Sequence, residues 1–240
     1  MNSHRRSAFL LRSGALLLAL LVPTTPPAAA GSKTWNEQLQ KILVHLRGQD
    51  WSAALTGSQE LLDSFGRSLA PGKKADHSVA MVVMCRALAE AGLGQEAEAA
   101  WDWHVAQQID PAIEGWNLSE FGAAGAVLDR HRSARDPRPE VADPLENPEI
   151  TPVERLGEPR FPAWPEGAYR LGWGGTIQVD MIVHADGTIS HPRILTAPPV
   201  ATLTLAAFDA MRANRYGPAR AGGEPVTSVY RFTMKFTYTR

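Results

Sequence analysis

The chain contains a single cysteine, Cys85, among its 240 residues. One cysteine cannot form an intramolecular disulfide, so the fold has to be held together by packing and hydrogen bonds. Its neighbours Val82, Val83, Met84 and Leu88 are apolar. This environment predicts that Cys85 is a buried core residue and not a reactive thiol.

An excess of charge of either sign is also missing. Lysine and arginine number 24 against 25 aspartates and glutamates, which gives a formal net charge of −1. No bulk positive field would therefore draw the chain to nucleic acid. The hydrophobic content of 44% is enough for one or two buried cores in a chain of this length.

A hydrophobic run long enough to span a membrane is absent from the N-terminal region. Arg5, Arg6 and Arg12 make a basic start, and the apolar run 14–22 covers nine residues, whereas a spanning helix needs about 20. Three alanines at 28–30 precede a glycine, as at a cleavage site. Residues 1–30 are therefore predicted to be a cleaved secretory signal, with an uncleaved inner-membrane anchor as the alternative.

Motifs for catalysis are absent as well. The sequence has no serine in a Gly-x-Ser-x-Gly elbow and no glycine-rich loop that leads into a Lys-Ser or Lys-Thr pair. His184 and His191 flank a predicted hairpin without a third ligand, and are expected to be solvated strand positions. His104 and His131 lie on predicted helices with no ligand at helical spacing. We therefore expect no enzyme, no metal site and no cofactor.

Residues 33–132 are predicted to form a helical domain, because apolar residues recur there at helical spacing. The expected helices cover residues 34–46, 51–65, 76–91, 95–109 and 118–131. The apolar faces of the first two are Trp35, Leu39, Ile42, Leu43 and Leu46, then Trp51, Ala54, Leu55, Leu61, Leu62 and Phe65.

The third and fourth of these helices resemble a tetratricopeptide repeat. That 34-residue pattern has two small positions, an aromatic one, a third small one and a proline. In this sequence they are Ala87, Ala99, Trp103, Ala106 and Pro111. The resemblance implies two helical hairpins with a surface for protein segments. The alternative is a plain helical bundle that binds nothing.

Residues 133–158 are predicted to be a linker between two domains. Prolines with acidic residues between them favour an extended, semi-rigid chain. These prolines are Pro137, Pro139, Pro144, Pro148 and Pro152.

The C-terminal third alternates as β-structure does. Ile177, Val179, Met181 and Val183 share one face of a strand over residues 176–184. The pair Asp186-Gly187 predicts a hairpin, because glycine adopts positive φ without steric cost. A return strand covers residues 188–195, and Pro198-Pro199 is expected to end it.

A helix and a last strand follow. Residues 202–214 have apolar positions at helical spacing, and residues 226–238 alternate aromatic and polar side chains. One face of the last strand carries Tyr230, Phe232, Met234 and Phe236. The fold class predicted for the chain is α+β, with N-terminal helical hairpins and a C-terminal ββαβ domain that has a three-stranded antiparallel sheet and one helix.

The ordered set of motifs in residues 159–240 resembles the C-terminal domain of the TonB energy transducers. The matching pieces are Phe161-Pro162, Gly174-Gly175, Asp186-Gly187, 215–218 (RYGP), 222–226 (GGEPV) and 230–238 (YRFTMKFTY). The resemblance implies a periplasmic protein that binds a segment of an outer-membrane TonB-dependent transporter or another envelope protein, and a homodimer is possible. The chain differs from the family at Glu158, where glutamine is frequent, and it lacks the family's long Pro-Lys and Glu-Pro run.

Binding is expected by strand addition, because the last strand of such a sheet leaves an open edge. The resemblance places a second contact in the segment before the Phe-Pro pair. The predicted partner-binding residues are Glu158, Pro159, Arg160, Phe161, Pro162, Val229, Arg231, Thr233, Lys235 and Thr237. The alternative function is a periplasmic scaffold that binds proteins through its helical hairpins without energy transduction.

Overall fold

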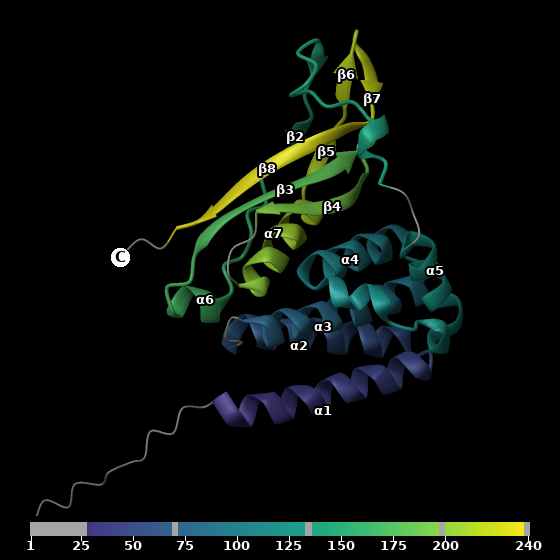
Figure 1. The fold of residues 1–240 in the computed structure, drawn as a ribbon, viewed down its shortest axis with the longest axis vertical. Coiled ribbons are helices and arrows are strands. Elements are labelled where there is room, and N and C mark those ends of the chain that lie inside the picture. The colour runs from purple at the N-terminus through teal and green to yellow at the C-terminus, as the bar shows by residue number, and fades with distance from the viewer. Residues whose placement is uncertain (1–27, 69–71, 133–135, 197–199, 238–240) are drawn as a thin grey trace, which may run out of the picture.

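The computed structural model describes residues 28–68, 72–132, 136–196 and 200–237 (Figure 1). Most of the predicted signal segment, the Pro198-Pro199 pair and Tyr238 lie outside these residues. Side chains at 28–33, 73 and 74 are likewise outside the description.

The N-terminal region is helical, as the apolar periodicity predicts. Helix α3 is its centre: it packs against α2, α4 and α5, and its residues 79–85 are all buried. Cys85 is completely buried, as predicted, and burial raises the pKa of its thiol to about 12. The elements are α1 (Ala28–Arg47), α2 (Trp51–Ser68), α3 (Lys73–Gly92), α4 (Glu96–Ile109), the 3-10 turns η1 (Pro111–Gly115) and η2 (Ser119–Phe121), and α5 (Gly122–Arg132).

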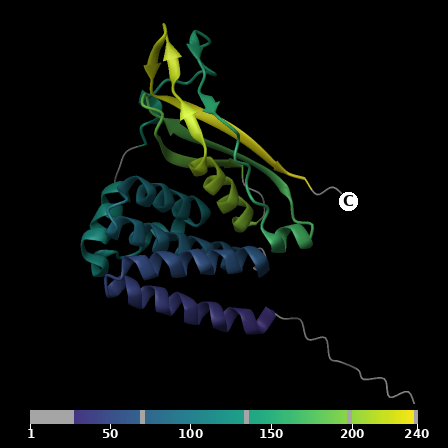
Figure 2. The same cartoon turned by 180° about the vertical axis from the view of Figure 1, so that it is seen from behind.

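The predicted ββαβ unit is confirmed. Strands β3 (Gly175–Val183), β4 (Ile189–Thr196) and β8 (Ser228–Phe236) form an antiparallel sheet in the order β4-β3-β8. Nine residue pairs join β3 to β8, from Gly175↔Phe236 to Val183↔Ser228. Helix α7 (Ala201–Ala213) covers the apolar face of this sheet (Figures 1 and 2).

The last strand is shorter than predicted. Thr227 separates β8 from β7 (Glu224–Val226), which pairs with β6 (Ala219–Ala221) in a small hairpin. Residues 215–217, expected only to stop the helix, form β5 (Arg215–Gly217), and a short helix, α6 (Glu166–Arg170), follows the Phe-Pro motif. These elements are too short to leave a periodic signal in the sequence.

The description of residues 133–158 as an extended spacer is wrong for the part that the structure describes. Residues 136–158 include the 3-10 turn η3 (Arg138–Glu140), β1 (Ile150–Thr151) and β2 (Glu154–Leu156). Strand β1 pairs with β6, and β2 pairs with β5. The segment therefore packs on the C-terminal domain, while the domain boundaries themselves remain predictions.

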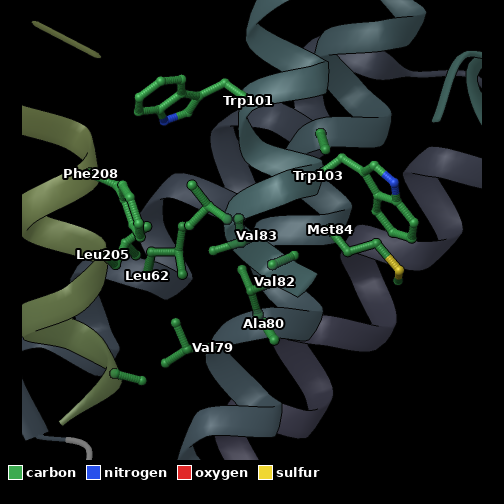
Figure 3. Close-up of a cluster of buried hydrophobic side chains, with 14 of the residues drawn as sticks. Leu62, Val79, Ala80, Val82, Val83, Met84, Trp101, Trp103, Leu205 and Phe208 are labelled. Carbon is green, nitrogen blue, oxygen red and sulfur yellow. The ribbon is translucent and has the colours of Figure 1, made fainter. Parts of the chain in front are cut away.

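Helix α7 also packs on the helical region, so the two halves share one hydrophobic core. Figure 3 shows Leu205 and Phe208 of α7 pointing toward α2, α3 and α4. The rings of Trp101 and Phe208 meet edge to face, with 6.1 Å between their centroids. The C-terminal sheet is thus held against the helices through α7.

Candidate protein-docking edge

The outer edge of β8 is open along most of its length. The hydrogen bonds at its beginning show which of its residues point their main-chain N–H and C=O groups outward. The Val229 N–H donates to the Ala142 carbonyl (2.8 Å), and the Ala142 N–H donates to the Thr227 carbonyl (3.3 Å). Main-chain groups of alternate residues point to opposite sides of a strand. Arg231, Thr233 and Lys235 therefore direct their N–H and C=O groups away from β3, toward the open edge.

Side chains on this strand divide in the same way. Arg231, Thr233 and Lys235 are exposed, whereas Met234 and Phe236 are buried toward the core. Among the described residues, β8 has no neighbouring strand on its outer side beyond the single bridge from Ala142 to Ser228. A free segment of edge therefore covers residues 231–235.

The predicted partner-binding residues are not equivalent in the structure. Val229 is buried and its N–H is already bonded, and Arg231 pairs with Asp143. Thr233 and Lys235 are exposed on the free part of the edge, and Thr237 follows the end of the strand. Sequence periodicity gave the side-chain alternation correctly, but not the direction of the amides.

Arg155 contacts both the Phe-Pro motif, at Phe161, and strand β8, at Phe232. Glu158, Pro159 and Arg160 are exposed, Pro162 is half-buried, and Phe161 is 74% exposed. The Arg155 guanidinium lies 5.8 Å from the ring centre of Phe161 and 5.9 Å from that of Phe232. One cation therefore connects both predicted contact regions.

A hollow opens beside Phe161 and is shared by both halves of the molecule. It has a volume of about 510 Å³ and lies between α2, α7 and residues 160–166. The backbone there is fixed by Asn214, whose amide group exchanges two hydrogen bonds of 2.9 Å with the main chain of Arg160. A partner segment at Phe161 would thus touch the helical region as well.

The opposite edge of the sheet, β4, is covered. The side chain of Gln108 on α4 accepts a hydrogen bond from the Ile194 N–H (3.1 Å), and α4 packs along β4. Pro192 has no N–H to offer, and His191 adopts a positive φ of 51° where the register to β3 shifts. Strand addition at β4 is therefore blocked by α4 and its Gln108, by Pro192 and by the register shift at His191.

Histidines from three elements gather at this covered edge. The ring of His104 lies 4.9 Å from that of His191 and 6.2 Å from that of His131, measured between centroids. Burial, and then the neighbouring His191, lower the pKa of His104 to about 4. The expectation that His184 and His191 are solvated is wrong, because both are half-buried and bond the Ser190 hydroxyl.

A buried ion cluster joins α3 and α4 to α7. Arg86 donates to both Asp102 oxygens and to Asp209 (3.0 Å), and Arg212 donates to Asp102 (3.2 Å) and Glu90 (3.1 Å). Burial, followed by the charge of Asp102, raises the pKa of Glu90 to about 8. A proton on Glu90 leaves two guanidiniums facing two carboxylates. The sequence contains these charges at helical spacing but does not reveal that they face one another.

No group of three His, Cys, Asp or Glu side chains in the described ranges is arranged to hold a metal ion. Within those same ranges, every helix is too short or too polar to cross a membrane.

Comparison with known families supports the resemblance of the C-terminal region to the TonB C-terminal domain. Residues 160–238, about a third of the chain, match the family model described as Gram-negative bacterial TonB protein C-terminal. A search of curated proteins gives no match. The C-terminal domain is therefore of the TonB C-terminal type, a non-enzymatic protein-interaction domain of the cell envelope, and the helical region precedes it.

Proposed function

We propose that this protein is a TonB-like periplasmic binding module, which docks a segment of an outer-membrane TonB-dependent transporter by strand addition to β8. In this role it would support energy-coupled transport. The observation that carries the proposal is the free outer edge at Arg231, Thr233 and Lys235 in a domain of the TonB C-terminal type. An extended peptide is the ligand that such an edge recognises.

Main-chain hydrogen bonds would supply most of the affinity. Each contributes about 0.5–1.5 kcal/mol net, and three outward-facing residues offer a donor and an acceptor each. Phe161, Arg155 and Phe232 would add contacts beside the edge, because Phe161 is exposed and the guanidinium lies over both rings. Of the predicted site, Thr233 and Lys235 are proposed as the docking positions and residues 158–162 as the flanking contact.

Proline substitution of adjacent residues tests the docking edge. Thr233→Pro removes an N–H that points outward, so the domain should stay folded while binding falls at least about tenfold. Met234→Pro removes an N–H that points toward β3, where Met234 is paired with Ile177, and should unfold the domain. The measurement is titration with a TonB-box peptide, together with a melting curve for each variant.

Thr233→Ala is the matched control, since it truncates the same side chain and keeps the amide. It should bind as the parent does. Equal binding by folded Thr233→Pro and Thr233→Ala would show that β8 is not the docking edge.

A scaffold function of the helical region is the second candidate. A hollow of about 560 Å³ lies between α1 and α2, lined by Lys41, His45 and Glu60 among others, and Val44 nearby on α1 is 64% exposed. Gly57 and Ile42 both line this hollow, and a Cβ at Gly57 would lie 3.1 Å from the Ile42 side chain, so a larger side chain there would have to extend into the hollow and shift Ile42 slightly. Loss of partner capture in Gly57→Leu, with full capture in Thr233→Pro, would favour the scaffold.

The proposed location is the periplasm, after removal of residues 1–30. N-terminal sequencing of the mature protein from an envelope fraction tests this. A start near Gly31 is expected, and an intact N-terminus in washed inner membranes would replace this proposal with the membrane anchor.

A further inference from the structure

One short segment of the chain already occupies the start of the docking edge. We call residues 141–147 the strap. Ala142 runs parallel to β8 opposite Ser228, and it makes the two main-chain hydrogen bonds to Thr227 and Val229 described above. The strap thus pairs with β8 in the way that an added strand would, but over one residue only.

A carboxylate of the strap holds the first exposed side chain of the edge. Asp143 accepts two hydrogen bonds from Arg231, of 2.7 Å and 3.1 Å, and its side chain is only 12% exposed. Burial alone would raise the pKa of Asp143, but the hydrogen bonds from Arg231 and from the Leu145 N–H bring it below its ordinary value. Arg231 is thereby kept occupied by a charged partner from its own chain.

The chain is anchored to the C-terminal domain on both sides of the strap. Upstream, Arg138 donates to buried Asp180 (3.1 Å), and downstream Ile150 pairs with Ala221. Leu145, between the anchors, is 75% exposed. The strap meets β8 through Ala142 and Asp143, and these two residues can leave the strand while the anchors on either side stay in place.

A buried hydroxyl that has no hydrogen-bond partner in the described part of the chain lies at the residue where the strap meets β8. Ser228, which lies opposite Ala142, is fully buried, and its hydroxyl has no hydrogen-bond partner among the described residues. A buried hydroxyl without a partner is unfavourable. The start of β8, where the strap is bridged, therefore has a polar group that is not satisfied within the described ranges.

We propose that Arg231 selects partner segments that carry a carboxylate, and that Asp143 of the strap imitates this carboxylate until the partner displaces it. The inference rests on the proposed docking edge. A strand added along residues 231–235 places every second side chain on the exposed face. The fitting partner is an extended acidic peptide with two carboxylates four residues apart, one for Arg231 and one for Lys235.

Hydrogen exchange in the full chain tests the strap. Asp143→Asn keeps the oxygen that accepts from Leu145 but loses the charge that binds Arg231. The Val229 amide should then exchange about tenfold faster, which corresponds to 1.4 kcal/mol. Glu146→Gln, a matched loss of charge in the exposed turn of the strap, should leave it unchanged. Equal exchange in all three proteins would overturn the inference.

Binding of a labelled peptide with the strap's own sequence, residues 138–147 (RPEVADPLEN), tests the selectivity. The Asp143→Asn chain should bind it about tenfold more tightly than the parent chain, because the edge is released. A peptide with Asn in place of its Asp should lose that gain, and so should the chain with Arg231→Gln added. The same affinity in every combination would contradict the role of Arg231.

These outcomes are separable from the proposed function. If the strap experiments fail while Thr233→Pro still abolishes binding of the TonB-box peptide, the docking edge stands and this inference falls. If the strap peptide binds as expected and no TonB-box peptide does, the edge selects an acidic segment and the transporter role falls.

Discussion

The two edges of the same sheet differ, because β4 is covered and most of β8 is open. At β4, a helix from the N-terminal region packs along the strand, its Gln108 bonds the Ile194 amide, and Pro192 withholds a donor. At β8, the described residues leave 231–235 unpaired except for an ion pair to the strap. Open strand edges promote unwanted association, so closing one edge confines a partner strand to the other.

The difference follows from how the helical region packs on the C-terminal domain. Helix α7 joins the sheet to α3 and α4 through a buried ion cluster and the contact of Phe208 with Trp101. The same packing brings α4 onto β4. The helical region therefore covers one edge of the sheet.

Breaking the ion cluster should have the largest effect on this arrangement. Arg86→Met leaves Asp102, which is fully buried, without its main partner, and should destabilise the protein by about 3–5 kcal/mol. Thermal melting measures the loss. The control is Arg130→Met, which removes an exposed pair with Glu96 and should cost less than about 1 kcal/mol. Equal melting of both variants would show that the cluster does not hold the two halves together.

Acid should loosen the covered edge at the histidines. The pKa of His104 is lowered to about 4 in the folded protein, so protonation favours the unfolded chain, where the pKa is ordinary. The stability that neutral His104 contributes is complete above about pH 6.5 and decreases toward pH 4, by up to about 3 kcal/mol. Melting curves between pH 7.5 and pH 4.5 measure this.

His104→Gln is the control for the acid effect, because glutamine does not titrate. Its melting temperature should fall less with acid than that of the parent. Identical pH profiles would place the sensitivity elsewhere, for example at His191. The pKa of His191 is also lowered, by burial and then by the charge of Arg138.

Removing the Gln108 side chain, which bonds the edge of β4, should have a smaller effect on stability. Gln108→Ala leaves the Ile194 amide without its acceptor, and should cost about 0.5–1.5 kcal/mol. The neighbouring Gln107→Ala should be close to neutral and serves as the control. Exchange of the Ile194 amide should rise in the first variant only; a rise in both would mean that α4 as a whole, and not Gln108, protects the edge.

Exposed side chains on the open edge should matter least to folding. Thr233→Ala and Lys235→Ala should each change stability by less than about 0.5 kcal/mol, since neither side chain is buried. Lys235→Ala should also leave binding of the strap peptide to the Asp143→Asn chain nearly unchanged, because that peptide carries Pro139 and Asn147, and no carboxylate, four residues from its Asp. A large loss of stability in either variant would show that the face is covered.

Much of this fold follows from local patterns. The alternation of Ile177, Val179 and Met181 and the helical spacing in α7 identify long elements, because each buries one continuous face. Strands β2 and β5 were not predicted, since three residues carry no period. Frequent prolines predict a spacer over residues 133–158, whereas the pairing of its described part with β5 and β6 depends on residues far away in the sequence.

The candidate site was predictable only in part. The aromatic alternation of β8 and the motif at Phe161 predict a strand and a segment for partner binding, yet the direction of the amides depends on pairing with β3. Arg86 and Arg212 are 126 positions apart, and nothing local links them to Asp102. Charged groups that meet across a domain contact leave no periodic signal.

The long register between β3 and β8 has a mechanical consequence. A peptide added to β8 and pulled along its own axis loads its hydrogen bonds in parallel, so that they resist together and do not unzip one after another. The nine residue pairs that tie β8 to β3 carry that load in the same geometry. Tension applied at the edge would thereby pass through the sheet to α7, and from there to the helices that α7 contacts.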